Sequence, residues 1–422
     1  MSQTRVLVLL AGAALGFATT ASAGTTPDTD RAYAAELKAD ADARTQQLAG
    51  NGLTLAEDGN TKINLSGFSQ FRYTMNWRDD PANLADGTHQ SGFTNGFENV
   101  RTRLAGTGNI MVRDLTFKIE GQFATDGGQF TMLDAWGNYR FDNGVSVKWG
   151  QYQVPLWREW TLSPFGQLAA DYSIATAVYN PGYTQGVMLG YRNDSWSITG
   201  GVNDGAQAAN TGFDSPNEAD IGLTARVDFK GGGDWKIFDD FSAWKGQETG
   251  WTIGGAVHWQ NSGNTNASAP VAQDQLLMAS IDGSYEGNGW NIYLCGIWQH
   301  IDPQDASANS ENQDNFGLIA HIGAFVTDDI ELFARYDGVY LDDDGTGSDN
   351  SDFNTITLGG NYYPFQKSRA ARFTADLQWL IEATDTNAAV NALANTNDNP
   401  IGILPSSEDN EVAVRLQFEL AF

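Results

Sequence analysis

The segment 411–422, EVAVRLQFELAF, decides the fold class of this chain. Successive side chains of a β-strand point to opposite faces, and this segment alternates in polarity at every position. One face carries Val412, Val414, Leu416, Phe418, Leu420 and Phe422, and the other carries Glu411, Ala413, Arg415, Gln417, Glu419 and Ala421. Such a strand separates an apolar surface from a polar one. A strand of a soluble β-sandwich shows the same alternation, so the pattern alone leaves both architectures open.

The two ends of the sequence favour a membrane address. A terminal strand that closes on Phe422 resembles the assembly signal of bacterial outer-membrane proteins and is less easily explained by a sandwich. Residues 1–23 read as a secretory signal peptide, with Arg5 before an apolar run at 6–17 and a cleavage site at Ala21-Ser22-Ala23. That run is too short to span a bilayer. We expect an exported chain.

The composition agrees with a membrane barrel. The chain has 52 acidic and 24 basic residues and a mean hydropathy of −0.36, values that an acidic soluble protein would share. Its 47 glycines and its 13 Trp, 14 Tyr and 22 Phe recur between short alternating segments, which favours an all-β architecture. A barrel has a low average hydropathy because half of each strand faces lipid and half faces water. Cys295 is the only cysteine, which excludes intramolecular disulfides, and the acidic charge argues against nucleic acid as a partner.

Alternation with a period of two continues through the rest of the chain. Sixteen segments show it: 62–76, 99–112, 115–124, 131–141, 145–154, 186–191, 196–203, 219–230, 252–260, 275–285, 290–300, 315–325, 330–341, 354–363, 371–383 and 411–422. Connections after even-numbered strands are mostly tight, and those after odd-numbered strands are mostly long. We therefore predict that residues 61–422 form a 16-stranded transmembrane antiparallel β-barrel with short periplasmic turns.

Two connections do not fit this scheme. The stretch 231–251 is long for a periplasmic turn, and 125–130 is short for an outer loop. Either one strand pair is misassigned, or the turn at 231–251 carries an insertion.

Residues 24–60 have a different character. Their central part, 30–48 (DRAYAAELKADADARTQQL), is rich in Ala, Leu, Glu and Lys and lacks Gly and Pro. Ala34, Leu37 and Ala41 follow a spacing of three to four, which predicts a short periplasmic helix. A coiled coil and a solvated helical linker both stay open, because short isolated helices are marginal.

Four segments in the first half follow one another in the order of a known family. They are FTNGFENVRTR (93–103), LTFKIEGQF (115–123), LDAWGNYRF (133–141) and VKWGQYQVPLWREW (147–160). The chain resembles the phosphate-selective porin O and P family, in which an arginine-bearing strand precedes a K-x-E strand. Gln153 stands where that family has a lysine, so the resemblance implies a porin without implying phosphate selectivity.

The alternation points several charged side chains into the predicted barrel. The pore-lining candidates are Arg72, Arg101, Arg103, Lys118, Glu120, Asp134, Arg140, Lys148 and Arg415. Fixed charges of this kind set ion selectivity in a pore. Two interpretations stay open: the bases form a basic strip along one side, or they pair with Glu120, Asp134 and loop carboxylates and leave a neutral wall. The predicted outer loops are acidic, which would attract cations to that rim.

The long connection 155–185 is the candidate constriction loop. It follows the strand after which porins commonly fold a loop inward, and it carries Arg158, Glu159, Asp171 and Tyr172. Opposing charges at a narrow point orient a permeating solute. A loop that lies on the surface is the alternative.

No catalytic constellation stands out. The four histidines (His89, His258, His300 and His321) are scattered, and we expect no enzyme activity, metal or cofactor. We expect a trimeric porin in the bacterial outer membrane, in contact with its lipid, that lets small hydrophilic solutes or ions diffuse through a water-filled lumen. One alternative is a hydrolase at the rim near His300 and His321. Another is a surface protein anchored by the barrel, which predicts a plugged lumen and much longer loops or an extra domain, and the sequence shows neither.

Overall fold

The computed structural model describes residues 52–79, 92–125, 127–263, 274–303, 311–342, 352–396 and 399–422. The chain divides into two units, Met1–Thr45 and Gln46–Phe422, and the described residues all belong to the second. The predicted signal peptide, the predicted helix at 30–48 and His89 lie outside the described residues. No helix among the described residues is long and apolar enough to cross a membrane.

Within the described residues, seventeen strands form one antiparallel sheet. They are β1 (Leu53–Glu57), β2 (Lys62–Trp77), β3 (Phe93–Asn109), β4 (Leu115–Phe123), β5 (Phe130–Arg140), β6 (Val145–Gln153), β7 (Tyr183–Arg192), β8 (Trp196–Asn203), β9 (Ile221–Gly231), β10 (Gly250–Asn261), β11 (Gln275–Gly287), β12 (Trp290–Asp302), β13 (Gln313–Phe325), β14 (Ile330–Tyr340), β15 (Phe353–Tyr362), β16 (Ala371–Leu380) and β17 (Glu411–Ala421). Each strand from β2 to β17 pairs with its neighbours in sequence.

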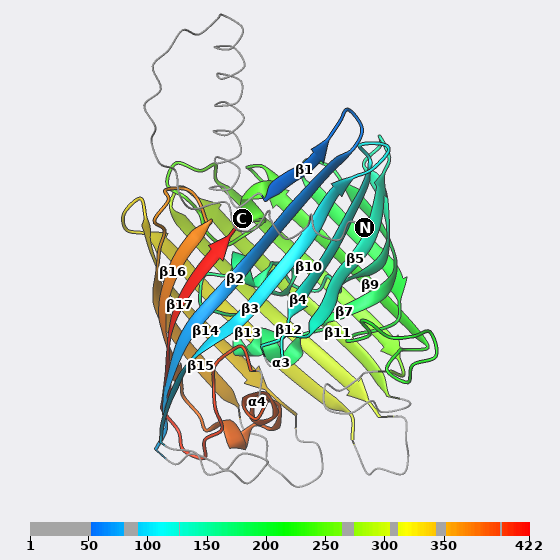
Figure 1. Ribbon diagram of the computed structural model, residues 1–422. Coiled ribbons are helices and arrows are strands. Elements are labelled where there is room, and N and C mark those ends of the chain that lie inside the picture. Colours follow the sequence, from blue (N-terminus) through cyan, green and yellow to red (C-terminus); the bar gives the residue numbers. More distant parts are fainter. Residues whose placement is uncertain are drawn as a thin grey trace, which may run out of the picture. The chain divides into compact units, whose positions relative to one another are not determined.

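The last strand closes the sheet on the first long one, β17 on β2, with Val412 opposite Trp77 and Ala421 opposite Phe68. Figure 1 shows the red β17 lying beside the blue β2. The predicted barrel of sixteen strands, β2 to β17, is therefore confirmed. All sixteen predicted segments coincide with strands, and the largest difference is at the start of β3, which begins at Phe93 and not at residue 99.

The sequence did not predict the short strand β1. It pairs with β2 beyond the end of β17, with Leu53 opposite Leu65. Phe422 exchanges two backbone hydrogen bonds with Gly67, at 3.1 and 3.0 Å. The C-terminus and β1 thus cover successive parts of one edge of β2, so that edge is paired where β17 ends.

The connections define two rims. The short-turn rim holds tight turns such as 288–289 between β11 and β12, and the long-loop rim holds the connections 154–182 and 381–410. The long loops contain short helices, α2 (Arg158–Thr161), η1 (Pro164–Gly166), α3 (Ile174–Tyr179), η3 (Thr384–Thr386) and α4 (Ala388–Ala394). Both connections that did not fit the scheme are genuine. The turn between β9 and β10 carries an insertion with a helical turn, η2 (Trp235–Phe238), and β4 joins β5 through a tight link at the long-loop rim.

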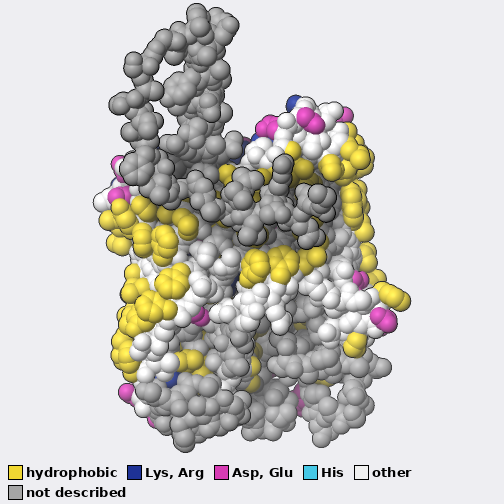
Figure 2. Space-filling view, viewed as in Figure 1, with side chains coloured by type: hydrophobic (Ala, Val, Ile, Leu, Met, Phe, Trp, Pro, Cys, Tyr) yellow, Lys and Arg dark blue, Asp and Glu magenta, His cyan; other side chains and the backbone are white. Residues whose placement is uncertain are grey.

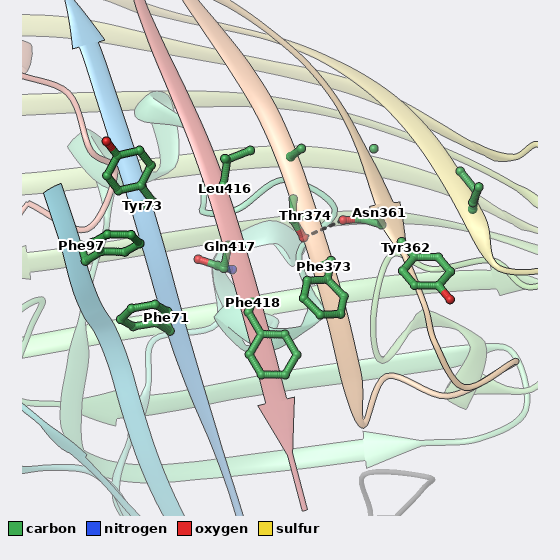
Figure 3. A pocket seen from close by; sticks show the side chains of 13 residues that line it. Phe71, Tyr73, Phe97, Asn361, Tyr362, Phe373, Thr374, Leu416, Gln417 and Phe418 are labelled. Atoms are coloured by element: carbon green, nitrogen blue, oxygen red, sulfur yellow. Dashed lines mark hydrogen bonds between the residues drawn. The ribbon is translucent and has the colours of Figure 1, made fainter. Parts of the chain in front are cut away.

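Outward side chains of the barrel are apolar and exposed, as a surface that faces lipid requires. Ile119, Leu294 and Leu332 are each more than half exposed, whereas the inward Arg72, Arg372 and Arg415 are fully buried. Figure 2 shows hydrophobic side chains gathered on the outer wall. A shallow groove of about 630 Å³ crosses this wall from β3 to β14 (Figure 3). It forms because Gly360 and Ala375 leave space among rings such as Phe71, Phe373 and Phe418.

Candidate functional site

The inside of the barrel is largely filled, because the connection 154–182 folds into it. We call this segment the constriction loop. On one side the main chain of Leu156 accepts hydrogen bonds from Arg226 on β9 and Ser280 on β11. On the other side Asp171 accepts hydrogen bonds from Arg72 on β2 and Arg101 on β3. The loop therefore crosses the whole lumen.

The middle of the loop is fastened to the intervening strands. Ala170 N donates to Asp376 on β16 at 2.9 Å, and Ala175 N donates to Asp337 on β14 at 3.2 Å. The loop's α3 packs on an apolar part of the wall, where Ile297 and Ile319 face inward and are buried. A dry, apolar contact of this kind is a packed core and not a water-filled channel.

Two other segments complete the filling. The insertion 232–249 enters from the short-turn rim, and its fully buried Phe241 lies 4.3 Å from the ring centre of His321. The connection 381–410 covers the loop from the long-loop rim, where the Ile401 carbonyl accepts a hydrogen bond from Arg415 at 2.8 Å. The widely open channel expected for sixteen strands is thus reduced by these inward-folded segments.

Among the described residues, cavities lie between the constriction loop and the wall formed by β2 to β5, and two of them concern the site. The first, about 560 Å³, lies towards the long-loop rim and is lined by Arg101, Trp160, Tyr172 and Tyr183, among others. The second, about 210 Å³, lies towards the short-turn rim. Its lining includes Phe68, Lys118, Glu120, Phe165 and Phe422. Arg103 lines both cavities, so its side chain lies between them. We call the two cavities together the eccentric passage.

Charges at the passage occur in pairs. Lys118 Nζ lies 2.7 Å from Glu120 and 2.8 Å from Asp134. Arg103 makes a longer contact of 3.3 Å with Glu120, and its Nε donates to Gln122 at 2.8 Å. These contacts correspond to the interpretation in which lumen bases pair with neighbouring carboxylates.

Asp171 is the carboxylate that binds the constriction loop to the wall. It is fully buried, and its oxygens lie 2.7 to 2.9 Å from the guanidinium nitrogens of Arg72 and Arg101. Burial alone would raise the pKa of Asp171, but the two guanidiniums outweigh it and hold the pKa well below its usual range. The two guanidiniums therefore stabilise the charged form of Asp171.

The predicted pore-lining residues fall into distinct places. Arg101, Arg103, Lys118 and Glu120 line the passage, and Asp134 pairs with Lys118 beside it. Arg72 and Arg415 point inward but are buried beneath the constriction loop and the connection 381–410. Lys148 lies over the Trp136 ring at 4.5 Å, and Arg140 is exposed at the short-turn end of β5.

The four predicted residues of the constriction loop lie in different parts of the lumen. Asp171 and Tyr172 lie beside the passage, where Arg101 lies over the Tyr172 ring at 5.9 Å. Arg158 pairs with Glu286 on β11 at 2.6 Å, far around the wall. Glu159 accepts hydrogen bonds from Ser173 inside the loop. Gln153 donates to the Trp160 carbonyl and helps to hold the loop.

Several residues of the site escaped the sequence argument. Phe68 lies on a predicted strand whose alternation gives its direction, whereas Tyr183 fell within the predicted loop 155–185. The sequence gives no sign of which inward residues stay uncovered. Trp160 lies in the predicted loop without a periodic signal. The sequence contained one indication of the insertion 232–249 that enters the lumen, namely that this connection is too long for a simple turn. Among the described residues, no group of three or more His, Cys, Asp or Glu is placed to hold a metal ion.

His300 and His321, the pair considered for a rim hydrolase, do not converge. His300 lies opposite Asp314 at the long-loop end of β12, and its Nδ1 is 3.0 Å from that carboxylate. His321 lies opposite Tyr293, and its ring is buried within the lumen.

Solved structures of outer-membrane proteins have a similar architecture. OmpT of Vibrio cholerae is 13% identical and aligns over 88% of this chain and 100% of its own, with a TM-score of 0.54. An anion-selective porin from Comamonas acidovorans is 13% identical and aligns over 86% of this chain and 100% of its own, with a TM-score of 0.55. OmpF of Salmonella typhi is 13% identical and aligns over 87% of this chain and 100% of its own, with the same TM-score. The fold is that of the outer-membrane porins. At this identity the likeness concerns the fold alone; no family profile and no curated protein sequence matches the chain.

Proposed function

We propose that this protein is a passive porin of the bacterial outer membrane and that small hydrophilic solutes or ions cross it through the eccentric passage. The observation that carries the proposal is that the two cavities, one towards each rim, share Arg103. Arg103 makes only one short polar contact, whereas the buried arginines of the filled part are held by several acceptors. We infer that movement of its side chain governs passage between the two cavities.

Membrane location and assembly rest on likeness and surface chemistry. The apolar outer wall suits contact with outer-membrane lipid. One similar structure, OmpT of Vibrio cholerae, is described in a trimer form. We propose a homotrimer for this chain as well, which native mass spectrometry in a mild detergent would test. The kinship with the phosphate-selective porin O and P family rests on the motif order at 93–160 and stays a hypothesis.

Planar-bilayer recording tests the channel. The purified full chain should give discrete conductance steps, in threes if it is trimeric. Arg103→Ala should raise the unitary conductance, because it removes the side chain at the junction. Arg113→Ala removes an equal charge from an exposed turn between β3 and β4 and serves as the matched control. The absence of steps from protein shown to be folded would overturn the proposal.

The filled lumen also gives weight to the competing function, a surface protein anchored by its barrel. Three inward-folded segments occupy most of the interior, as that hypothesis predicts. The two functions differ in the role of Arg103: an anchor would be electrically silent both in the parent chain and in the Arg103→Ala variant. We favour the channel because the cavities of the passage are lined by charged side chains, which a plain anchor does not require.

A further inference from the structure

The cavity on the long-loop side has an unusual lining for a general diffusion pore. Its charged lining residues are Arg101 and Arg103, and no Asp or Glu is among the described residues that line it. The carboxylate that balances Arg101, Asp171, is fully buried behind the lining. A solute in this cavity therefore meets guanidinium groups directly.

The two guanidiniums differ in what they can offer. Both terminal nitrogens of Arg101 are bound to Asp171, at 2.7 and 2.9 Å. Arg103 uses Nε for Gln122 and Nη1 for a long contact to Glu120, and its Nη2 has no partner among the described residues. A guanidinium nitrogen with no partner can donate a strong, charge-assisted hydrogen bond to a carboxylate. The anion-binding donor of the cavity is thus Arg103.

The remainder of the lining favours a flat apolar body. Trp160 lies 5.9 Å from the Tyr172 ring and 6.1 Å from the Tyr183 ring. Leu393 and Ile401 line the same cavity from the connection 381–410. Ring faces and aliphatic side chains attract an aromatic ring, but they offer nothing to phosphate, which needs several donors.

Two amide side chains of the cavity lining already take part in hydrogen bonds. Asn210 donates to the Met132 carbonyl at 2.9 Å and accepts from Gln151 at 3.4 Å. Asn180 accepts from the Gly182 amide at 2.7 Å, and its carbonyl accepts from Gln207 at 2.6 Å. A neutral polyol would need such amides to be available for its hydroxyl groups, so the lining favours a ring with one anionic group over a sugar.

We propose that the long-loop cavity is a selectivity site for small monocarboxylates that carry a flat apolar ring, with the carboxylate on Arg103 and the ring against Trp160 and Tyr172. This inference rests on the proposed channel function. Arg103 is then the specificity-determining residue, because it also stands at the entrance to the second cavity. A ring-bearing carboxylate held there interrupts the flow of smaller ions.

The test measures the block of potassium chloride current through the purified full chain in planar bilayers. The probes are benzoate, acetate, benzyl alcohol and inorganic phosphate, which separate the contributions of ring and charge. We expect benzoate to interrupt the current at a concentration about tenfold or more below that of the other three, as one charge-assisted hydrogen bond and one ring contact allow. Equal potency of benzoate and acetate, or stronger block by phosphate, would overturn the inference while leaving the channel intact.

Two variants locate the site. Arg103→Gln should remove the advantage of benzoate, and Trp160→Leu should weaken benzoate block without changing the response to acetate. Arg113→Gln, at the exposed turn, is the control that should keep the parent response. If benzoate block survives Arg103→Gln in folded protein, the carboxylate binds elsewhere and the assignment is wrong. A chain without any conductance would count against the proposed channel itself.

Discussion

Arg101 and Asp171 form a bidentate ion pair, with Nη1 to Oδ2 at 2.7 Å and Nη2 to Oδ1 at 2.9 Å. The pair joins wall strand β3 to the constriction loop and is buried on both sides. The ion pair sets the distance between the constriction loop and β3. It lies beside the eccentric passage. The geometry of the pore therefore depends on a contact between the barrel and a segment that is not part of it.

Asp171→Ala should release the constriction loop from β2 and β3. The change leaves Arg72 and Arg101 buried without a counter-charge, which costs about 3–5 kcal/mol. We expect a lower unfolding midpoint in detergent together with a larger and noisier conductance. Asp314→Ala, at the exposed long-loop rim, is the control and should change neither quantity. Unaltered conductance in a folded Asp171→Ala channel would mean that other contacts alone hold the loop.

The same ion pair predicts the response to acid. Since the pKa of Asp171 is lowered in the folded state, its contribution to stability is fully present above the ordinary aspartate pKa of about 4 and is lost only as pH falls through the lower, folded value. Unitary conductance and loop protection against protease should stay constant as the pH falls from about 8 to about 5. A transition within that interval would show that Asp171 does not govern the docking of the loop.

Phe241→Ala tests the filling from the short-turn rim. Phe241 is fully buried, and Arg158 lies over its ring at 4.3 Å. Loss of the ring should cost about 3–5 kcal/mol. Conductance should not change, because the Phe241 side chain lines neither cavity of the passage. A marked rise in conductance would reveal a second route through the barrel, and chemical denaturation provides the measure of stability.

Thr54→Pro tests the role of β1 at the closure. Thr54 pairs with Asn64 of β2, and its hydroxyl donates to the Asn64 side chain at 3.0 Å. The variant removes that bond and a backbone donor, which should cost about 1–3 kcal/mol. The channel should conduct normally but should show a lower midpoint in heat-shift electrophoresis. Gly59→Pro, in the adjoining exposed turn where an added side chain would contact nothing, gives the comparison for a proline placed outside the strand pairing.

The barrel followed from local sequence, because strand periodicity is a property of neighbouring residues. Alternation identified all sixteen strands of the closed wall, and it pointed residues such as Arg103 and Lys118 inward. The alternating lengths of the connections separated the two rims, and the excess length of 231–251 marked its insertion. Only β1 was missed among the strands, since five residues with an irregular pairing carry little periodic signal.

The pore itself was decided by tertiary structure. Periodicity treats Arg72 and Arg103 alike, yet Arg72 is buried against Asp171 while Arg103 stands at the junction of two cavities. The difference arises because Asp171 lies 99 residues beyond Arg72 in the chain, and no local pattern reports such a contact. Sequence thus determined which side chains face the lumen. Three inward-folded segments, held by ion pairs and apolar packing, determined which of those side chains a solute can reach.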